Sequence, residues 1–145
     1  MKIHKITNNG STGDFTHVAI FSFADIAANA TSSNQVTIAT IPAGGALELA
    51  YVYERTPLVG ASDITLDVGT TSGDPDEFIN ALDVDAMTVP VFNTGDAFST
   101  PEEITGETTT AAPVLVEWNG TVASLTAGEV GIYLRILDPI RFSQS

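Results

Sequence analysis

The chain offers few side chains that could act as acid–base or nucleophilic groups. It has two histidines, His4 and His17, and no cysteine. A serine hydrolase needs a histidine beside an activated serine, and the G-x-S-x-G turn that presents such a serine in many hydrolases does not occur. No H-E-x-x-H zinc motif, phosphate-binding loop or dinucleotide fingerprint occurs either. The sequence therefore predicts that this protein is not an enzyme and uses no cofactor.

Calcium binding is a second chemistry that the acidic residues could perform. A Ca²⁺ ion takes about six to eight oxygen ligands. Asp63, Asp67, Asp74, Asp76 and Glu77 could supply some of them. Their spacing matches no EF-hand loop, because the run D-P-D-E-F lacks the alternating ligands and the glycine that such a loop requires. Acids at the start of a helix and in solvated turns explain the same residues, so we predict no metal site.

The charge balance narrows the classes of partner. Eighteen Asp and Glu residues against five Lys and Arg residues give a formal net charge of −13. A phosphate backbone requires clustered cations, so we expect no nucleic-acid partner, and an anionic membrane surface is equally disfavoured. The opening MKIHKITNNG contains no apolar run, and no segment approaches the roughly 18 apolar residues of a membrane span. We expect a protein made in the cytoplasm without an export signal.

Alternating apolar residues and turn signals predict a β protein. The stretch Gln35–Val68 reads as three consecutive strands, broken at Pro42-Ala43-Gly44-Gly45 and at Gly60-Ala61-Ser62, which predicts an antiparallel β-meander. Its third strand is expected to alternate Ile64, Leu66 and Val68 on one face with Asp63, Thr65 and Asp67 on the other. Its second strand is expected to place two sets of side chains on opposite faces: Leu47, Leu49, Tyr51 and Tyr53 on one, and Glu48, Ala50, Val52 and Glu54 on the other.

Further strands are predicted on both sides of this stretch. They are a buried strand over Phe15–Ile26, an edge strand over Met87–Phe92, a weak strand near Glu103–Thr105, a hairpin of Val114–Trp118 and Thr121–Leu125 around Asn119-Gly120, and a last core strand over Val130–Leu137. A turn at Gly73-Asp74-Pro75 is expected to start one short helix near residues 75–82.

Together these elements predict an all-β fold. The expected architecture is a single-domain antiparallel β-sandwich of the jelly-roll type, with the one short helix near residues 75–82. The sandwich should span residues 14–139, between a flexible N-terminal arm (1–13) and a C-terminal tail (140–145).

Three segments of the chain resemble a small structural protein of tailed bacteriophages. They are VTIATIPAGGALELAYVYE, DITLDVGTTSGDPDEF and LTAGEVGIYLRILDP. In that family an I-P-A-G-x-x-L turn opens a long strand, an L-D-V-G…G-D-P-D-x-F segment follows, and a T-A-G-x-V-x-V-x-V-x-Y strand closes the domain. The matching residues here are Ile41–Leu47, Leu66–Phe78 and Thr126–Leu137, and the resemblance covers about two thirds of the chain. The chain departs from the pattern at Leu134–Leu137, where the family often has an aromatic residue.

The resemblance implies a virion structural protein, namely a capsid decoration (cement) protein that binds the outer surface of the major capsid lattice and stabilises it. It also implies the major capsid protein as partner, assembly as a homo-trimer, and a location on the capsid exterior after synthesis in the host cytoplasm. Such a protein needs a rigid domain and adhesive surfaces rather than an active site. An acidic exterior would keep the free protein soluble and could face basic patches on the shell.

Eight residues are predicted to lie at an interface with a partner. The polar arm could become ordered on docking, two phenylalanines flank a polar loop, and an apolar tail follows the last strand. That tail packs either on a neighbouring subunit or back on its own domain. The residues are Lys2, His4 and Lys5 in the arm, Phe92 and Phe98 at the loop, and Pro139, Ile140 and Phe142 in the tail.

Two alternative functions stay open. A head-fibre, neck or tail component of the virion would carry the same strand pattern. A carbohydrate-binding jelly-roll module would need exposed aromatic rings on which a sugar can stack. The candidates for that platform are Tyr51, Tyr53, Trp118 and Tyr133, and burial of all four would exclude the module.

Overall fold

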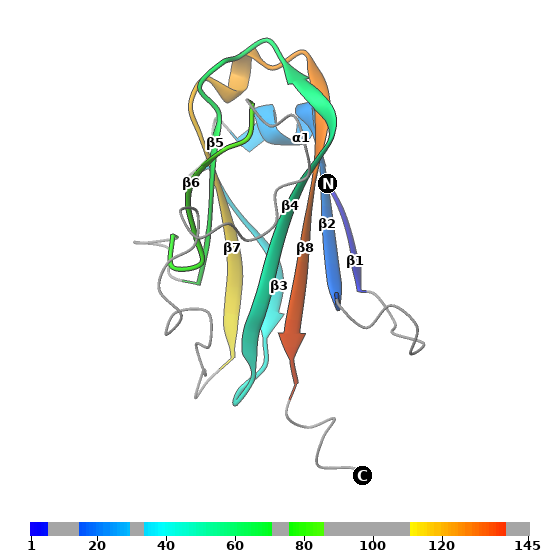
Figure 1. Cartoon of the computed structure of the whole chain (residues 1–145), viewed down its shortest axis with the longest axis vertical. Coiled ribbons are helices and arrows are strands. Elements are labelled where there is room, and N and C mark those ends of the chain that lie inside the picture. The colour runs from blue at the N-terminus through cyan, green and yellow to red at the C-terminus, as the bar shows by residue number, and fades with distance from the viewer. Residues whose placement is uncertain (6–14, 30–33, 71–75, 86–110, 139–145) are drawn as a thin grey trace.

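Two antiparallel four-stranded sheets pack face to face (Figure 1). The structure is a computed structural model that describes residues 1–5, 15–29, 34–70, 76–85 and 111–138. The sheets have the strand orders β1-β2-β8-β4 and β3-β7-β5-β6, which confirms the predicted all-β sandwich. The first sheet consists of β1 (Lys2–Lys5), β2 (His17–Ser22), β8 (Ala127–Leu137) and β4 (Ala46–Val59). The second consists of β3 (Gln35–Ile41), β7 (Ala112–Asn119), β5 (Thr65–Gly69) and β6 (Ile79–Asp83).

The chain passes repeatedly from one sheet to the other. The consecutive strands β2 and β3, β3 and β4, β4 and β5, and β7 and β8 lie in opposite sheets. Consecutive strands pair directly at β1–β2 and at β5–β6. The finer assignment to a jelly roll stays a prediction. The strands predicted over Met87–Phe92 and near Glu103–Thr105 lie outside the described residues.

The predicted meander over Gln35–Val68 is wrong, although its three strands are present. β3 pairs with β7, β4 pairs with β8, and β5 pairs with β6 and β7. The turn between β3 and β4 does reverse the chain, and the Gly45 N–H closes it by donating to the Pro42 carbonyl at 2.8 Å. Turn residues determine that reversal, but the sheet that receives the next strand depends on which apolar faces can be buried together.

A β-bulge in β4 changes which side chains point into the core. The register of β4 against β8 shifts just after Leu47. As a result Leu47, Ala50 and Val52 are all buried, whereas Tyr51 and Tyr53 are half-buried on the other side of the sheet. The predicted sharing of one face by Leu47 and Tyr51 is therefore wrong, because an extra residue in a bulge reverses the alternation of side chains.

The helix predicted near residues 75–82 is wrong. Residues 76–78 form a turn and bends, and Ile79–Asp83 is strand β6. The Phe78 N–H donates to the Val68 carbonyl at 2.9 Å, and Leu82 stands opposite Leu66 on β5. Pairing with the edge of β5 therefore overrides the local helix-start signal in this segment.

The helix α1 (Phe23–Ala28) instead follows β2, inside a segment predicted to be a strand up to Ile26. A capping box starts it. The Asp25 N–H donates to Ser22 Oγ at 3.3 Å, and the Ser22 N–H donates to Asp25 Oδ2 at 2.9 Å. The S-x-x-D spacing in the sequence carried this signal. Phe15–Ile26 is thus a strand only over His17–Ser22.

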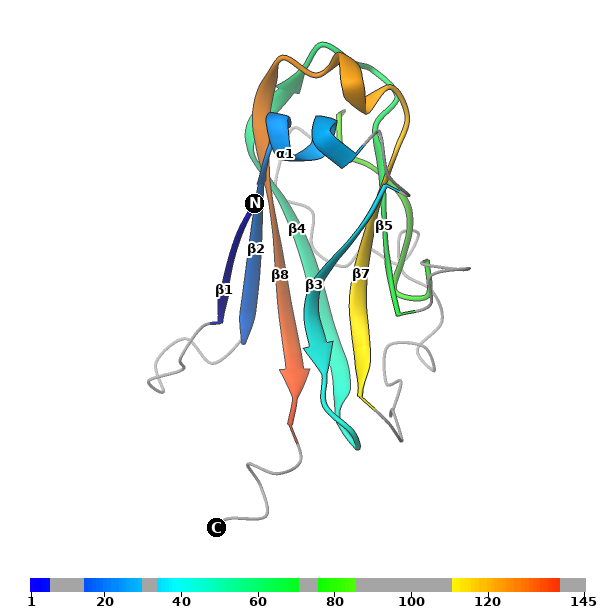
Figure 2. The same ribbon diagram turned by 180° about the vertical axis from the view of Figure 1, so that it is seen from behind.

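The predicted hairpin around Asn119-Gly120 is also wrong. β7 ends at Asn119, and the chain then forms the 3-10 helix η2 (Val122–Ser124) before it enters β8 in the other sheet. Hydrogen bonds from Thr121 to the Asp63 carboxylate hold this connection, and they lower the pKa of Asp63. η2 contacts α1, and both helices lie at one end of the sandwich, as Figure 2 shows for α1.

Apolar side chains from both sheets meet in one core. Trp118 from β7 and Phe21 from β2 are fully buried, and their ring centroids lie 5.3 Å apart in an edge-to-face arrangement. Trp118 Nε1 is buried and has no hydrogen-bond acceptor among the described residues. In this part of the chain no buried residue is polar or charged. The core is therefore apolar throughout the described residues, and the charged groups lie outside it.

We predict that Trp118→Ala lowers the free energy of unfolding by about 3–5 kcal/mol, because a large buried ring is lost and a cavity remains. Trp118→Phe should cost clearly less, since it keeps most of the packing and removes a donor without an acceptor. Urea unfolding followed by circular dichroism measures both changes. The exposed Ser124 gives the control variant Ser124→Ala, which should stay within about 0.5 kcal/mol of wild type. Wild-type stability of Trp118→Ala would contradict the core position.

Candidate functional site

The outer face of the β1-β2-β8-β4 sheet collects aromatic and cationic side chains. Residues directly opposite each other on neighbouring antiparallel strands share a face. One row across the four strands holds His4, Val18, Tyr133 and Tyr51. The next row holds Lys2, Ile20, Gly131 and Tyr53. We name this surface the aromatic–cationic face and define it by these eight residues together with Phe15, Arg55 and Arg135.

Three rings pack together at the centre of this face. The centroids of Phe15 and Tyr51 lie 5.8 Å apart, those of Phe15 and Tyr133 5.5 Å, and those of Tyr51 and Tyr133 5.7 Å. Thr16 holds Phe15 in place, because its N–H donates to the Leu134 carbonyl at 2.8 Å. The Tyr51 and Tyr133 rings are tilted by 59°, so the three rings form a compact cluster rather than a flat platform.

Gly131 leaves room for two long side chains above β8. A Cβ atom at this position would lie 3.0 Å from Tyr133 Cε2 and 3.5 Å from Arg55 Cδ. Arg55 Nη1 lies 3.1 Å from Glu129 Oε1, and the two side chains are 40% and 36% exposed. An ion pair as exposed as this one contributes about 1 kcal/mol or less to stability. The Arg55 guanidinium can therefore exchange this contact for a carboxylate of a partner at small cost.

The Tyr51 hydroxyl acts as a neutral hydrogen-bond donor around physiological pH. Burial raises the pKa of the Tyr51 hydroxyl above its ordinary value of 10.0, and the neighbouring Tyr53 and Tyr133 raise it further when they ionise. Hydroxyl donors and guanidinium groups thus stand side by side on one surface. Both kinds of group are suited to a partner that presents carboxylates.

The outer face of the β3-β7-β5-β6 sheet has the opposite character. One row across it holds Gln35, Glu117 and Asp67, and Thr65 stands opposite both Asn119 and Asp83. The four described strands contain no Lys or Arg. We name this surface the acidic face and define it by Gln35, Thr65, Asp67, Asp83, Glu117 and Asn119. Four more acids lie in the described residues next to these strands: Asp63, Asp76, Glu77 and Asp85.

Asp67 is the most constrained acid of this face. Its Oδ1 accepts from the Ala81 N–H at 2.6 Å, and its Oδ2 accepts from Asn119 Nδ2 at 2.7 Å. Burial raises the pKa of the Asp67 carboxyl and the facing Glu117 raises it further, while the two hydrogen bonds act in the opposite direction without cancelling the shift. Like charges directly opposite each other destabilise a strand pair. A cationic partner placed over Asp67 and Glu117 would relieve that repulsion.

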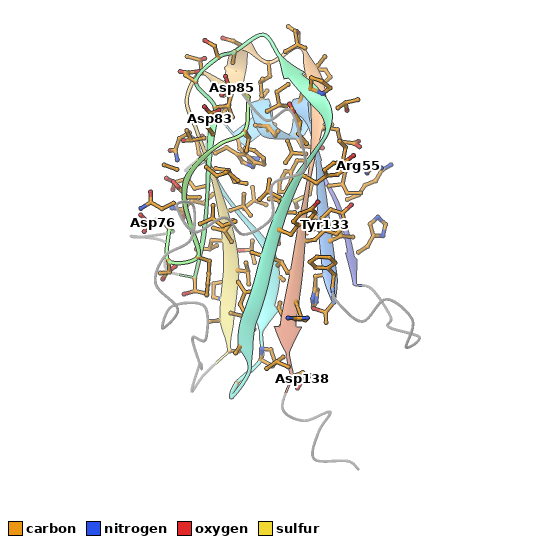
Figure 3. All side chains as sticks on the ribbon, in the orientation of Figure 1. Arg55, Asp76, Asp83, Asp85, Tyr133 and Asp138 are labelled. Carbon is orange, nitrogen blue, oxygen red and sulfur yellow. The ribbon has the colours of Figure 1, made fainter. Side chains whose placement is uncertain are left out.

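The described cations of the sandwich all lie in one sheet, whose strands also carry the acids Glu48, Glu54 and Glu129. Every Lys and Arg in the described part of the chain belongs to β1, β4 or β8. These residues are Lys2, Lys5, Arg55 and Arg135. Figure 3 shows Arg55 and Tyr133 on one side of the molecule and the acids Asp76, Asp83 and Asp85 on the other. The described strands of the other sheet carry acids and no Lys or Arg.

Three of the eight predicted interface residues lie in the described part of the chain. Lys2 and His4 are exposed on β1 and belong to the aromatic–cationic face, and Lys5 ends β1 opposite His17. Residues 2–5 of the predicted flexible arm thus form a strand that pairs with β2. The remaining predicted interface residues lie outside the described residues: Phe92, Phe98, Pro139, Ile140 and Phe142.

Sequence reasoning missed Arg55, Arg135 and Phe15 as members of this face, and it considered the tyrosines only as a sugar platform. Burial of Trp118 removes it from that platform and leaves Tyr51, Tyr53 and Tyr133, which are half-buried. The Tyr-x-Tyr-x-Arg spacing at positions 51–55 was the available signal, because alternate residues of a strand share a face.

Metal binding finds no site in the described part of the chain. It contains no group of three or more His, Asp or Glu side chains arranged to hold a metal ion. Of the acids considered for calcium, Asp63 and Asp67 instead accept hydrogen bonds from neighbouring protein groups, and Asp74 lies outside the described residues. None of the described helices has both the length and the apolar character needed to cross a bilayer.

Comparisons of this chain with protein-family models, with curated proteins and with solved structures found no match.

We predict that Asp67→Asn gains stability relative to wild type as the pH rises from below 3.8 to neutral. The folded state raises the pKa of Asp67. The stability that the Asp67 carboxyl contributes is therefore fully present below its ordinary pKa, and it is lost as the pH rises through its pKa in the folded state. Urea unfolding at a series of pH values measures the difference.

The control for this measurement is Asp63→Asn, because the folded state lowers the pKa of Asp63. The stability that Asp63 contributes is present above its ordinary pKa and is lost as the pH falls through its pKa in the folded state. The stability of Asp63→Asn relative to wild type should therefore change with pH in the opposite direction. Slopes of the same sign for both variants would show that the environment assigned to Asp67 is incorrect.

Proposed function

We propose that this protein is a capsid decoration protein of a tailed bacteriophage. It binds the outer surface of the major capsid lattice as a homo-trimer and stabilises the shell. It acts by adhesion rather than by catalysis, and it reaches the exterior of the virion after synthesis in the host cytoplasm.

One observation carries this proposal: a single sandwich presents two outer faces of opposite chemical character. A protein that joins subunits of a shell has to touch at least two neighbours, and two adhesive faces meet that requirement. Tyrosine and arginine are enriched at protein–protein interfaces, and Tyr51, Tyr133 and Arg55 gather on one face. The acids of the other face, Asp67 and Glu117 among them, would complement basic patches on a shell.

The segments that resemble phage structural proteins support the same function. Ile41–Leu47 joins β3 to β4, Leu66–Phe78 begins within β5, and Thr126–Leu137 contains β8. β8 lies between β2 and β4 and carries Gly131 and Tyr133 of the aromatic–cationic face. The resemblance thus falls on strands that build both faces.

Stabilisation of a shell by such a protein follows from mass action. A ligand that binds the assembled lattice, and not the dissociated subunits, shifts the equilibrium toward the lattice. A stiff β-sandwich suits this role, because little conformational entropy is lost when a pre-ordered surface docks.

We predict saturable binding of the purified protein to undecorated capsids of its own virus, together with a higher thermal unfolding temperature of the shell. Cosedimentation and scanning calorimetry measure these two effects. Arg55→Glu or Glu117→Arg should reduce the amount bound, because each reverses a charge on one of the two faces. The control variants Ala43→Glu and Ala43→Arg change the charge of the exposed β3–β4 turn and should bind like wild type. Absence of binding at every salt concentration would refute the decoration role.

A head-fibre, neck or tail component of the virion would use the same faces. Electron microscopy of gold-labelled protein on intact particles separates these locations from the capsid lattice.

A carbohydrate-binding module is the second candidate function, because Tyr51, Tyr53 and Tyr133 share one half-exposed face. The tilt of the central rings and the burial of Trp118 both count against a flat stacking platform. We expect no binding on a glycan array. Saturable binding of one glycan by wild type, lost in Tyr53→Ala and kept in Thr37→Ala, would replace the proposal.

A further inference from the structure

We propose that the aromatic–cationic face of one copy of this chain binds the acidic face of a second copy, in a head-to-tail contact. The inference rests on the proposed function only for the expectation that copies associate. The chemical character of the two faces supports the contact itself.

Charge favours a contact between unlike faces of two copies. Each copy carries a formal net charge of −13, so copies repel each other on average. A contact between two acidic faces would place Asp67 and Glu117 next to carboxylates of the second copy. A contact between two aromatic–cationic faces would place Lys2 and Arg55 next to cations of the second copy. Joining unlike faces pairs opposite charges instead, and like-charge contacts across an interface are strongly disfavoured.

The groups on the two faces are also complementary as hydrogen-bond partners. The aromatic–cationic face offers guanidinium groups and tyrosine hydroxyls, which are donors, at Arg55, Tyr51 and Tyr133. The acidic face offers the carboxylates of Asp67 and Glu117, which are acceptors. A guanidinium can bind a carboxylate through two parallel hydrogen bonds. The repulsion between those two facing carboxylates would fall when a cation lies over them.

The aromatic cluster supplies the apolar centre that such a contact needs. Phe15, Tyr51 and Tyr133 are each half-buried, and Val18 and Ile20 lie beside Tyr133 and Gly131 on β2. Burying these rings against a second copy removes apolar surface from water. Interfaces commonly combine an aromatic centre of this kind with a charged rim.

The location of the two faces fixes the symmetry of the contact. They are the outer faces of two sheets packed against each other, so they point away from one another. A contact between unlike faces is heterologous: every copy that uses one face keeps its other face for a further copy. Such contacts either close into a ring or continue as an open stack.

Sedimentation equilibrium of the purified full chain, without capsids, tests the contact. Wild type should associate, and Arg55→Glu and Glu117→Arg should each weaken association by at least about tenfold. An equimolar mixture of these two variants should regain association, because the intact acidic face of one fits the intact aromatic–cationic face of the other. Ala43→Glu and Ala43→Arg should associate like wild type.

Three results would overturn the proposal. One is a wild type that stays monomeric at all concentrations. Another is a Glu117→Arg variant that associates like wild type, which would indicate a contact between like faces. The third is a mixture that fails to associate while both variants keep the wild-type circular dichroism spectrum and melting temperature.

Two safeguards keep the test decisive. If a charge-reversed variant unfolds, Arg55→Gln and Glu117→Gln replace the pair and should weaken association in the same direction. A growing series of masses supports an open stack of copies joined by the proposed contact. Capsid binding is measured separately, so the decoration role and the self-contact can fail independently.

Discussion

Mutual burial of two apolar sheet faces is the constraint on which the rest of this structure depends. Trp118 and Phe21 meet edge to face between the sheets, and the core around them contains no polar or charged residue among those that the structure describes. Charged groups cannot enter such an interior without a large desolvation cost. Among the described residues they therefore lie on the two outer faces and at the ends of the sandwich, where they can contact other molecules.

The strand connections then decide which charges share a face. β4 and β8 pair along most of their length, although they are far apart in the sequence, and this pairing brings Arg55, Tyr51 and Tyr133 together. β5 and β7 pair in the other sheet and set Asp67 opposite Glu117. Because the chain crosses between the sheets at β3–β4, β4–β5 and β7–β8, its few cations and part of its many acids are sorted onto opposite sides. The sorting gives an acidic protein one surface of the opposite character.

Local patterns predicted much of the secondary structure, and long-range contacts decided what was missed. The alternation of Ile64, Leu66 and Val68 correctly identified the buried side of β5, because a strand with one buried face needs a period of two. The bulge after Leu47 has no comparable signature, and it turned Tyr51 to the surface. The partner of each strand depends on apolar faces distant in sequence, so the meander and the Asn119-Gly120 hairpin were wrong even though the chain does turn there. The aromatic–cationic face was missed for the same reason, since its members come from four strands.

The central claim is that this sandwich works by adhesion through its outer sheet faces. Electron cryomicroscopy of the same capsids with and without the protein tests it most directly, at a resolution that separates β-strands. The account predicts added density on the outside of the lattice, with one or both outer sheet faces pressed against a neighbouring molecule. Capsids without added density, or density in which both faces point into solvent, would contradict it.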